Sequence, residues 1–306
     1  RAGIKAVRIT PFRADEPASI ITPSGNPDDI AYLLFTSGST GTPKCVATSH
    51  RPLVHFTQWQ ADAFEVTAND TVTMLSGLGH DPVMRDIFLP LHTGARLAVP
   101  EGLDFLSPGA LNDWLAATGA TAVHLTPPLG RLLLQGHADR QPLHGIRHLF
   151  FGGDILRTAL VKDMRALCPD AMAVNFYGAT ETPQAISYSL ADADAHTGAV
   201  PIGQAAPGFD LAVEDAAGHE LARNEPGKLV VRSAFLSLGY IEDGELKAHA
   251  CDDTGSRIYD TGDRAYRGPS GDLRIVGRGD DQVKIRGFRV EPAEVASVLS
   301  QIHEIG

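Results

Sequence analysis

Short apolar runs alternate with helix-like spacing of apolar positions along the first two thirds of the chain. Residues 30–35 form an unbroken apolar run, which predicts a buried strand. Helices are expected after Ser49, as far as about Phe64, and from Ser107-Pro108. Three later runs predict further buried strands, at residues 121–125, 148–151 and 171–176. Buried strands that alternate with helices predict a mainly parallel sheet covered by helices.

The pattern of predicted secondary structure changes after residue 190. Short glycine-bounded strands without intervening helices are expected near residues 209–214, 228–232, 257–260 and 272–276. They predict a small β-barrel or an antiparallel sheet. Apolar positions recur at helical spacing from Pro292 onwards, which predicts a final helix. We therefore expect three parts. Residues 1–190 would form an N-terminally incomplete α/β subdomain that binds nucleotide and substrate, and residues 191–279 a small β subdomain. Residues 280–306 would contain the hinge and the start of a truncated C-terminal α+β subdomain.

Composition narrows the class of protein. The 306 residues carry 26 Lys and Arg against 37 Asp and Glu, a formal net charge of −11, with 43% hydrophobic residues. This acidic balance argues against a nucleic-acid binder, which needs a basic surface. No apolar run approaches the ~18 residues that a membrane helix needs. With no signal-peptide pattern and three scattered cysteines, a cytoplasmic protein is expected.

A loop that follows the first predicted strand carries the most specific candidate chemistry. It runs from Thr36 to Lys44 with the sequence Thr-Ser-Gly-Ser-Thr-Gly-Thr-Pro-Lys. Glycines let the backbone approach a phosphate closely, hydroxyls and amides donate to its oxygens, and the lysine adds positive charge. It is not a Walker A loop, because Lys44 follows Pro43 and Cys45 stands where that motif has Ser or Thr. The loop predicts a phosphate-binding site of another kind.

Five motifs in one order resemble the adenylate-forming enzymes, specifically the amino-acid adenylation domains of non-ribosomal peptide synthetases. They are the loop, Asn175–Glu181 (Asn-Phe-Tyr-Gly-Ala-Thr-Glu), Gly227–Tyr240, Tyr259–Asp263 (Tyr-Asp-Thr-Gly-Asp) and Gly277–Glu291. The resemblance covers nearly the whole chain. Family members also carry a longer N-terminal region and a C-terminal catalytic lysine, so the sequence is expected to be partial.

The resemblance implies a role for each nucleotide-binding residue. Tyr177 would stack on adenine, Asn175 would bind its amino group, and Asp263, assisted by Arg278, would bind the ribose hydroxyls. Glu181 would hold Mg²⁺ against the phosphates, as a hard oxygen ligand does. The resemblance also implies catalytic roles for Thr36, Lys44, His80 and Glu181. The implied nucleotide-binding set is Thr36, Ser37, Gly38, Ser39, Thr40, Gly41, Lys44, Gly153, Asp154, Asn175, Tyr177, Gly178, Thr180, Asp263 and Arg278.

The segment Gly79-His80-Asp81-Pro82 bears on the substrate class. The resemblance implies that Asp81 pairs with the α-ammonium of an amino acid and that His80 gates the site. Asp81 could also be an ordinary helix N-cap. The implied substrate pocket consists of Asp81, Pro82, Arg85, Leu125, Phe150, Gly152, Phe176, Gln184 and Ala185. Arg85 could meet an acidic side chain or point to solvent, and a small-to-medium apolar or non-proteinogenic substrate fits slightly better than a basic one.

The resulting expectation is an enzyme that uses ATP and Mg²⁺ to form an aminoacyl adenylate. It would pass the aminoacyl group to the phosphopantetheine thiol of a carrier domain, with Asp280 as hinge and a small helper protein as a further possible partner. Two alternatives remain open. One is an acyl- or aryl-CoA ligase of the same superfamily, and the other is a truncated module that binds adenylate without turnover.

Overall fold

A seven-stranded sheet forms the largest layer of the protein. The computed structural model describes residues 25–38, 42–102, 104–136, 141–194, 197–285 and 288–299. The strands lie in the order β4-β3-β5-β6-β7-β8-β9, parallel as far as β7 and antiparallel beyond it. Their bounds are β3 Thr71–Thr73, β4 Arg96–Ala98, β5 Ala122–Leu125, β6 His148–Phe151, β7 Met172–Ala179, β8 Thr182–Leu190 and β9 Gln204–Ala205. The predicted parallel sheet is confirmed.

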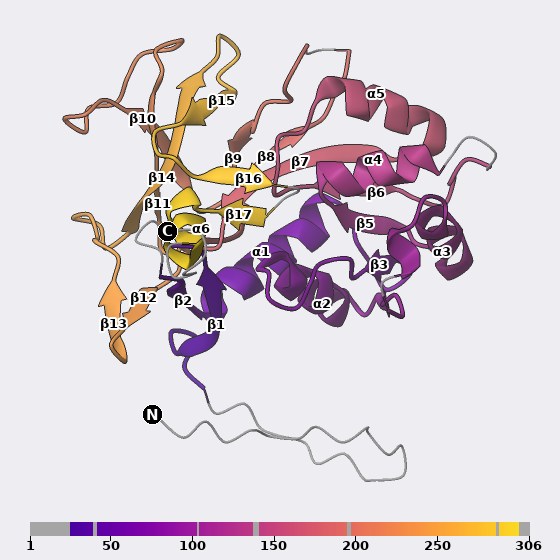
Figure 1. The fold of residues 1–306 in the computed structure, drawn as a ribbon, viewed down its shortest axis with the longest axis horizontal. Coiled ribbons are helices and arrows are strands. Elements are labelled where there is room, and N and C mark those ends of the chain that lie inside the picture. The colour runs from indigo at the N-terminus through magenta and orange to yellow at the C-terminus, as the bar shows by residue number, and fades with distance from the viewer. Residues whose placement is uncertain are drawn as a thin grey trace.

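Helices cover both faces of this sheet, as Figure 1 shows for α1 and α2 on one side and α4 and α5 on the other. The core under α1 and α2 contains Phe56, Phe150 and Phe176, whereas the opposite core contains Leu125 and Phe151. The helices are α1 His50–Ala63, α2 Pro82–Thr93, α3 Ala110–Thr118, α4 Pro127–Gln135, α5 Thr158–Leu167 and α6 Pro292–Leu299, with a short 3₁₀ helix at Asp104–Leu106. The helix expected from Ser107 begins three residues later, since Gly109 occupies its N-cap.

A second, antiparallel sheet confirms the predicted change to short strands without intervening helices after residue 190. Its order is β10-β11-β14-β15, with bounds β10 Asp210–Glu214, β11 Gly227–Ser233, β14 Arg257–Arg267 and β15 Leu273–Arg278. This open order matches the antiparallel alternative rather than a closed barrel. The proposed boundary at residue 190 stays a prediction: β9 still belongs to the large sheet, while Ile186 packs in the core of the small one.

A third sheet, β1-β2-β12-β13, brings distant motifs together. Its strands are β1 Ile30–Thr36, β2 Lys44–Ser49, β12 Gly239–Glu242 and β13 Glu245–Ala248. The prediction of a buried strand at 30–35 is wrong in its burial, because Ile30, Leu33 and Phe35 are 45%, 48% and 68% exposed. β1 pairs only with β2 at the sheet edge, and its side chains alternate between a half-buried and an exposed face.

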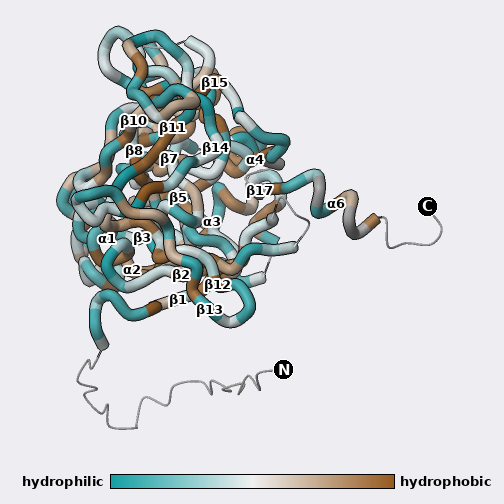
Figure 2. The backbone as a smooth tube through the Cα atoms, turned by 90° about the vertical axis from the view of Figure 1, so that its left-hand side faces the viewer, coloured by the Kyte–Doolittle hydropathy of each residue, from teal (hydrophilic) through white to brown (hydrophobic). Residues whose placement is uncertain are grey.

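The C-terminal part continues beyond the small sheet. β16 Val283–Ile285 pairs with β17 Phe288–Val290, and the predicted final helix is α6. Figure 2 shows α6 standing clear of the central strands, on which the apolar positions are concentrated. Among the helices that the structure describes, none has the length and apolar character needed to cross a membrane.

Candidate functional site

The predicted site residues gather where the parallel strands end. Asp81 follows β3 at the start of α2, Gly152 directly follows β6, and Tyr177 lies near the end of β7. In open α/β sheets, ligands bind outside these carboxyl ends of the strands. The topology therefore brings motifs that are about a hundred residues apart in the chain to one edge of the sheet.

Asp81 occupies the N-cap position of α2, but its side chain is held by Gln184 instead of capping the helix. Its Oδ2 accepts a hydrogen bond from the Gln184 backbone N–H at 2.9 Å, and its Oδ1 accepts one from Nε2 of the same residue at 3.1 Å. No side-chain cap hydrogen bond from Asp81 forms in the described structure. Gln184 has a positive φ of 71°, a strained conformation for a residue with a side chain. The strain is compensated by this clamp on Asp81.

Burial gives Asp81 an unusual protonation equilibrium. The carboxyl is 8% exposed, and loss of hydration raises its pKa to about 7, although the Gln184 N–H and the charge of Arg85 act in the opposite direction. A buried carboxylate whose charged form is this costly is stabilised by an arriving cation. The site is thus suited to bind an ammonium group.

Arg85 lies inside the site and not in solvent. It is 4% exposed, and its Cζ lies 5.8 Å from the ring centre of Phe176. Nη2 lies 3.8 Å from the position that a Cβ on Gly152 would occupy. That added Cβ would make only ordinary van der Waals contacts, so the glycine leaves room for a methyl group beside the guanidinium. The structure decides the direction of Arg85, which the sequence left open.

Phe150 and Phe176 form the apolar wall beside Arg85. Their rings stack with centroids 5.3 Å apart and an interplanar angle of 5°, and Ala185 is fully buried in the same core. Leu125 is a correction to the predicted pocket, because its side chain packs in the opposite core. Successive side chains of a strand point to opposite faces, and the residue of β5 in register with Phe150 is His124.

The predicted ribose residues Asp263 and Arg278 are register partners on β14 and β15, and Tyr177 of the seven-stranded sheet contacts the same carboxylate. The Tyr177 hydroxyl donates a hydrogen bond to Oδ2 of Asp263 at 2.5 Å, and Arg278 Nη1 contacts Oδ1 at 2.9 Å. Arg278 also pairs with Asp280 through Nε and Nη2, both at 2.6 Å. A carboxylate offers about four acceptor positions, so Asp263 retains capacity for hydroxyl donors. The predicted hinge residue is thus connected to the predicted ribose carboxylate.

Asn175, Gly153 and Asp154, which are predicted to lie beside the adenine, make local contacts within the protein. The Asn175 side-chain amide donates to the Pro201 carbonyl at 3.0 Å, which fixes the orientation of its amide plane. Asn175 Oδ1 is the acceptor that an exocyclic amine needs. Gly153 has a φ of 81°, and Asp154 caps the next backbone N–H at 2.7 Å. The Gly-Gly-Asp stretch is therefore a turn built on glycine.

Glu181 lies between the nucleotide motifs and the third sheet. It is fully buried in the turn between β7 and β8, and its Oε1 accepts a hydrogen bond from the Tyr240 hydroxyl at 3.1 Å. Lys44 Nζ lies 5.4 Å from the ring centre of the same tyrosine. Within the described residues, no group of three or more His, Cys, Asp and Glu side chains could hold a metal. Among the described residues, Glu181 is therefore a single carboxylate ligand and not part of a metal-binding cluster.

The phosphate loop is described only in part. Thr36 Oγ1 is buried without a hydrogen-bond partner in the described structure. Gly38 is required by packing, since an added Cβ would lie 2.0 Å from the Thr42 carbonyl oxygen. Ser39, Thr40 and Gly41 lie outside the described residues. His80 is exposed before α2, Pro82 is the first residue of that helix, and Gly178 allows a close approach to Ala185, while Ser37 and Thr180 are half-buried.

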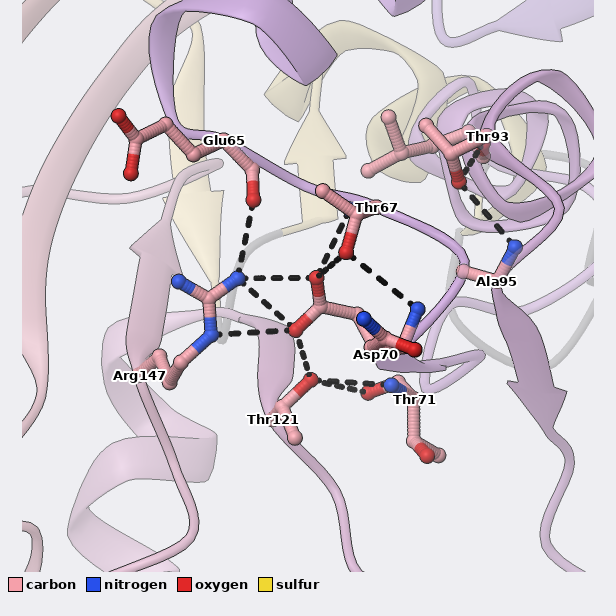
Figure 3. Close-up of polar contacts among 10 residues, drawn as sticks. Glu65, Thr67, Asp70, Thr71, Thr93, Ala95, Thr121 and Arg147 are labelled. Carbon is pink, nitrogen blue, oxygen red and sulfur yellow. Dashed lines mark hydrogen bonds and ion pairs between the residues drawn. The ribbon is translucent and has the colours of Figure 1, made fainter.

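A separate cavity lies at the other end of the sheet and does not coincide with these motifs. Its volume is about 800 Å³, and Asp70 and Arg147 are among its lining residues. Figure 3 shows Asp70 surrounded by donors from Thr67, Thr121 and Arg147, with distances of 2.7 to 2.9 Å for the shortest contacts. These donors come from the protein itself and occupy the hydrogen-bond acceptors of the Asp70 carboxylate. The cluster therefore joins the loops before β3, β5 and β6.

Four residues at the site escaped the sequence reasoning: Gln60, Asp86, His124 and Tyr240 as a Glu181 partner. The alternation of side chains along β5 would have revealed His124, because Phe150 and Gly152 share one face and so do their register partners. Asp86 directly follows Arg85 and is fully buried. Nothing in the local sequence around Gln60, on α1, indicates its contact with His124.

Comparisons with known proteins show the family of the chain. The model of the family described as AMP-binding enzyme matches residues 5–241. The large subunit of L-2-aminoadipate reductase from Penicillium chrysogenum is 36% identical over 90% of this chain and 22% of its own length. Bacitracin synthase 1 from Bacillus licheniformis is 32% identical over 94% of this chain and 6% of its own. The chain thus spans about a fifth or less of these relatives.

Solved structures give the same result. The Vibrio cholerae adenylation domain AlmE, in complex with glycyl-adenosine-5'-phosphate, superimposes with a TM-score of 0.81 at 30% identity, over 91% of this chain and 53% of that one. PA1221, an NRPS protein with adenylation and PCP domains bound to a vinylsulfonamide inhibitor, gives 0.83 at 32% identity, over 97% and 52%. The resemblance inferred from the five motifs is confirmed: the chain belongs to the AMP-binding enzyme family.

Proposed function

We propose that this chain forms the core of an enzyme that activates an α-amino acid as its aminoacyl adenylate. An oxygen of the amino-acid carboxylate attacks the α-phosphorus of ATP, a new O–P bond forms, and the bond to the β-phosphate oxygen breaks. The electron pair leaves with pyrophosphate. In a second step the thiol of a carrier-bound phosphopantetheine loses its proton, attacks the acyl carbon and releases AMP.

The clamped carboxylate of Asp81 is the observation that carries this proposal. It lies buried at the sheet edge where the nucleotide motifs converge, and a buried carboxylate without a cation is costly. An acyl or aryl substrate without an amine would not pair with it. The relatives named as L-2-aminoadipate reductases and as bacitracin synthase also support an amino acid as the substrate.

The remaining residues would position the nucleotide and neutralise its charge. Tyr177 would cover the adenine, Asp263 with Arg278 would bind the ribose, and Lys44 would face the phosphates. Glu181 would hold Mg²⁺, which fits a single buried carboxylate when phosphates and water complete the shell. When bound, Mg²⁺ supplies positive charge against the phosphate oxygens. A carrier domain is supported by PA1221 and by NpsA-ThdA, an artificial adenylation–PCP fusion.

Exchange of radiolabelled pyrophosphate into ATP, measured on the full-length protein over a broad amino-acid panel, tests the proposal. Asp81→Ala is expected to cost ~3–5 kcal/mol in use of the amino acid, because the ammonium loses its partner. The loss should be smaller with the matching acid that lacks the amine. Equal losses with both would favour an acyl- or aryl-CoA ligase, and adenylate binding without any exchange would favour a module that binds without turnover.

A further inference from the structure

The Arg85 guanidinium is a buried cation whose hydrogen-bonding capacity the protein does not use. Its Nε is buried without a hydrogen-bond partner in the described part of the chain. A guanidinium has five N–H donors in a planar fork that matches a carboxylate. Buried donors are normally paired, and leaving them unpaired is destabilising. The unsatisfied fork therefore points to a ligand.

The carboxylate nearest to Arg85 orients the guanidinium without binding it. Asp86 Oδ1 lies 3.9 Å from Arg85 Nε, beyond hydrogen-bond distance, and Asp86 is fully buried. The same oxygen lies 3.1 Å from His124 Nδ1, and His124 Nε2 lies 2.8 Å from the side-chain nitrogen of Gln60. Since Gln60 can only donate through that nitrogen, His124 Nε2 is the acceptor and Nδ1 carries the proton. Asp86 therefore lies between Arg85 and a histidine whose pKa is lowered by burial.

Arg85 lies close to two other residues of the predicted substrate pocket, Gly152 and Phe176. Nη2 lies beside Gly152, where a Cβ would meet it at 3.8 Å, and the Phe176 ring covers the group from one direction. Asp81, at the N-cap of the same helix α2, is assigned to the α-ammonium under the proposed function, and its charge interacts with that of Arg85. A substrate that fills the space between Asp81 and Gly152 would bring its side chain to the Nη groups. An apolar side chain would cover these donors and leave them unpaired.

We propose that Arg85 is the receptor for a carboxylate on the substrate side chain, so that the site takes a dicarboxylic α-amino acid. The inference rests on the proposed function and narrows it. Asp81 would bind the α-ammonium and Arg85 the side-chain carboxylate, which are the two charged groups of the substrate that do not react. Asp86 and His124 would act as positioning residues that hold the guanidinium in place.

The first experiment compares substrates on the unmodified full-length protein. Pyrophosphate exchange is measured with L-aspartate, L-glutamate and L-2-aminoadipate, and with L-glutamine and L-norleucine as neutral counterparts. We expect kcat/KM for the preferred acid to exceed that for either neutral counterpart by about 100-fold or more, because a site built to bind a polar group rejects analogues that lack it. Preference for an apolar amino acid or equal use of the amide would overturn the inference.

The second experiment tests the residue itself. Arg85→Gln should lower kcat/KM for the acid by about 100-fold or more and reduce its preference over glutamine to within about ten-fold. Arg131→Gln is the matched control, because Arg131 is exposed on α4. An Arg85→Gln protein that folds and retains its preference for the acid would refute the assignment.

Gly152→Ala provides an independent variant, because the fold has room for the methyl group. It should reduce use of the longest acid more than that of the shortest. An equal effect on both would mean that the space beside Arg85 does not hold the side chain. If no amino acid supports exchange, the proposed function fails. If exchange occurs only with neutral amino acids, the function stands and the role of Arg85 fails.

The positioning role of Asp86 is tested by a separate measurement. Asp86→Asn removes the carboxylate charge beside Nε and should raise the KM for the acid while changing kcat little, because the guanidinium loses its orientation but not its charge. A parallel fall in kcat for acid and neutral substrates alike would indicate a general structural role for Asp86 and contradict its positioning role.

Discussion

The Tyr240 hydroxyl donates a hydrogen bond to Oε1 of Glu181, at 3.1 Å, from a strand of a different sheet. Lys44 Nζ lies 5.4 Å from the ring centre of the same tyrosine. A residue of β12 thus contacts both the lysine of the phosphate loop and the carboxylate proposed to hold Mg²⁺. Pairing of β12 with β2 produces this arrangement, with Tyr240 in register with Val46.

Tyr240→Phe tests the hydrogen bond while keeping the ring for Lys44. Hydrogen bonds to charged groups contribute ~1.5–3 kcal/mol, so we expect pyrophosphate exchange to fall by about ten-fold or more and the requirement for Mg²⁺ to rise. The measurement is exchange rate against Mg²⁺ concentration. Tyr266→Phe on β14 serves as the control. Identical Mg²⁺ curves for Tyr240→Phe and the unmodified protein would contradict the role of this hydroxyl.

Glu181→Gln keeps an oxygen that can accept from Tyr240 but removes the negative charge. We expect exchange to fall by ~10²–10³, the loss typical of removing a group that stabilises developing charge. The comparison variant is Glu245→Gln, an exposed glutamate of β13 whose loss should leave exchange unchanged. Near-normal exchange in a folded Glu181→Gln protein would remove the basis for its metal role.

The pKa of Asp81, about 7, predicts a pH-dependent affinity for the amino acid. The ammonium needs the ionised carboxylate, so KM should decrease about ten-fold per pH unit as pH rises towards 7 and level off above it. Asp81→Asn should abolish this dependence. Steady-state exchange at pH 5.5 to 8.5 provides the measurement, and a KM that does not change across this range would contradict an unpaired, titrating Asp81.

The same shift predicts the sign of a stability effect. In the folded chain Asp81 keeps its proton up to about pH 7, whereas the ordinary value is 3.8, so the folded state binds more protons between these values. This contribution to stability is present below about pH 4 and is lost as pH rises through 7. Relative to Asp81→Asn, the unmodified protein should therefore lose ~2–3 kcal/mol of unfolding free energy between pH 5 and pH 8. Urea titrations at both pH values would reveal it, and a constant difference would contradict the burial argument.

Tyr177→Phe separates stacking from hydrogen bonding at the ribose. The aromatic face proposed for adenine remains, but Asp263 loses its 2.5 Å partner. We expect only a few-fold change in KM for ATP, because Arg278 still holds the carboxylate. Tyr177→Ala should cost at least ten-fold more, since the stacking surface is lost as well. Equal effects of both variants would mean that the ring does not contact the base.

Much of this protein is determined by local sequence. Buried apolar runs at 121–125, 148–151 and 171–176 predict three strands of the sheet, and the change to short glycine-bounded strands predicts the second one. The five motifs identify the family, because phosphate and ribose binding require particular residue types in a short stretch. Such features depend on neighbours a few residues apart, which is the range over which periodicity and turn chemistry act.

Other features were decided by tertiary structure. The apolar run at Ile30–Phe35 could not show that one face would lie exposed at a sheet edge, because burial depends on which strands pair. The same holds for His124 and Leu125, adjacent residues that packing assigns to opposite faces of the sheet. Whether Arg85 meets solvent or substrate depends on α2, β6 and β7 meeting around its guanidinium. These outcomes come from contacts between residues far apart in the chain, which no local pattern encodes.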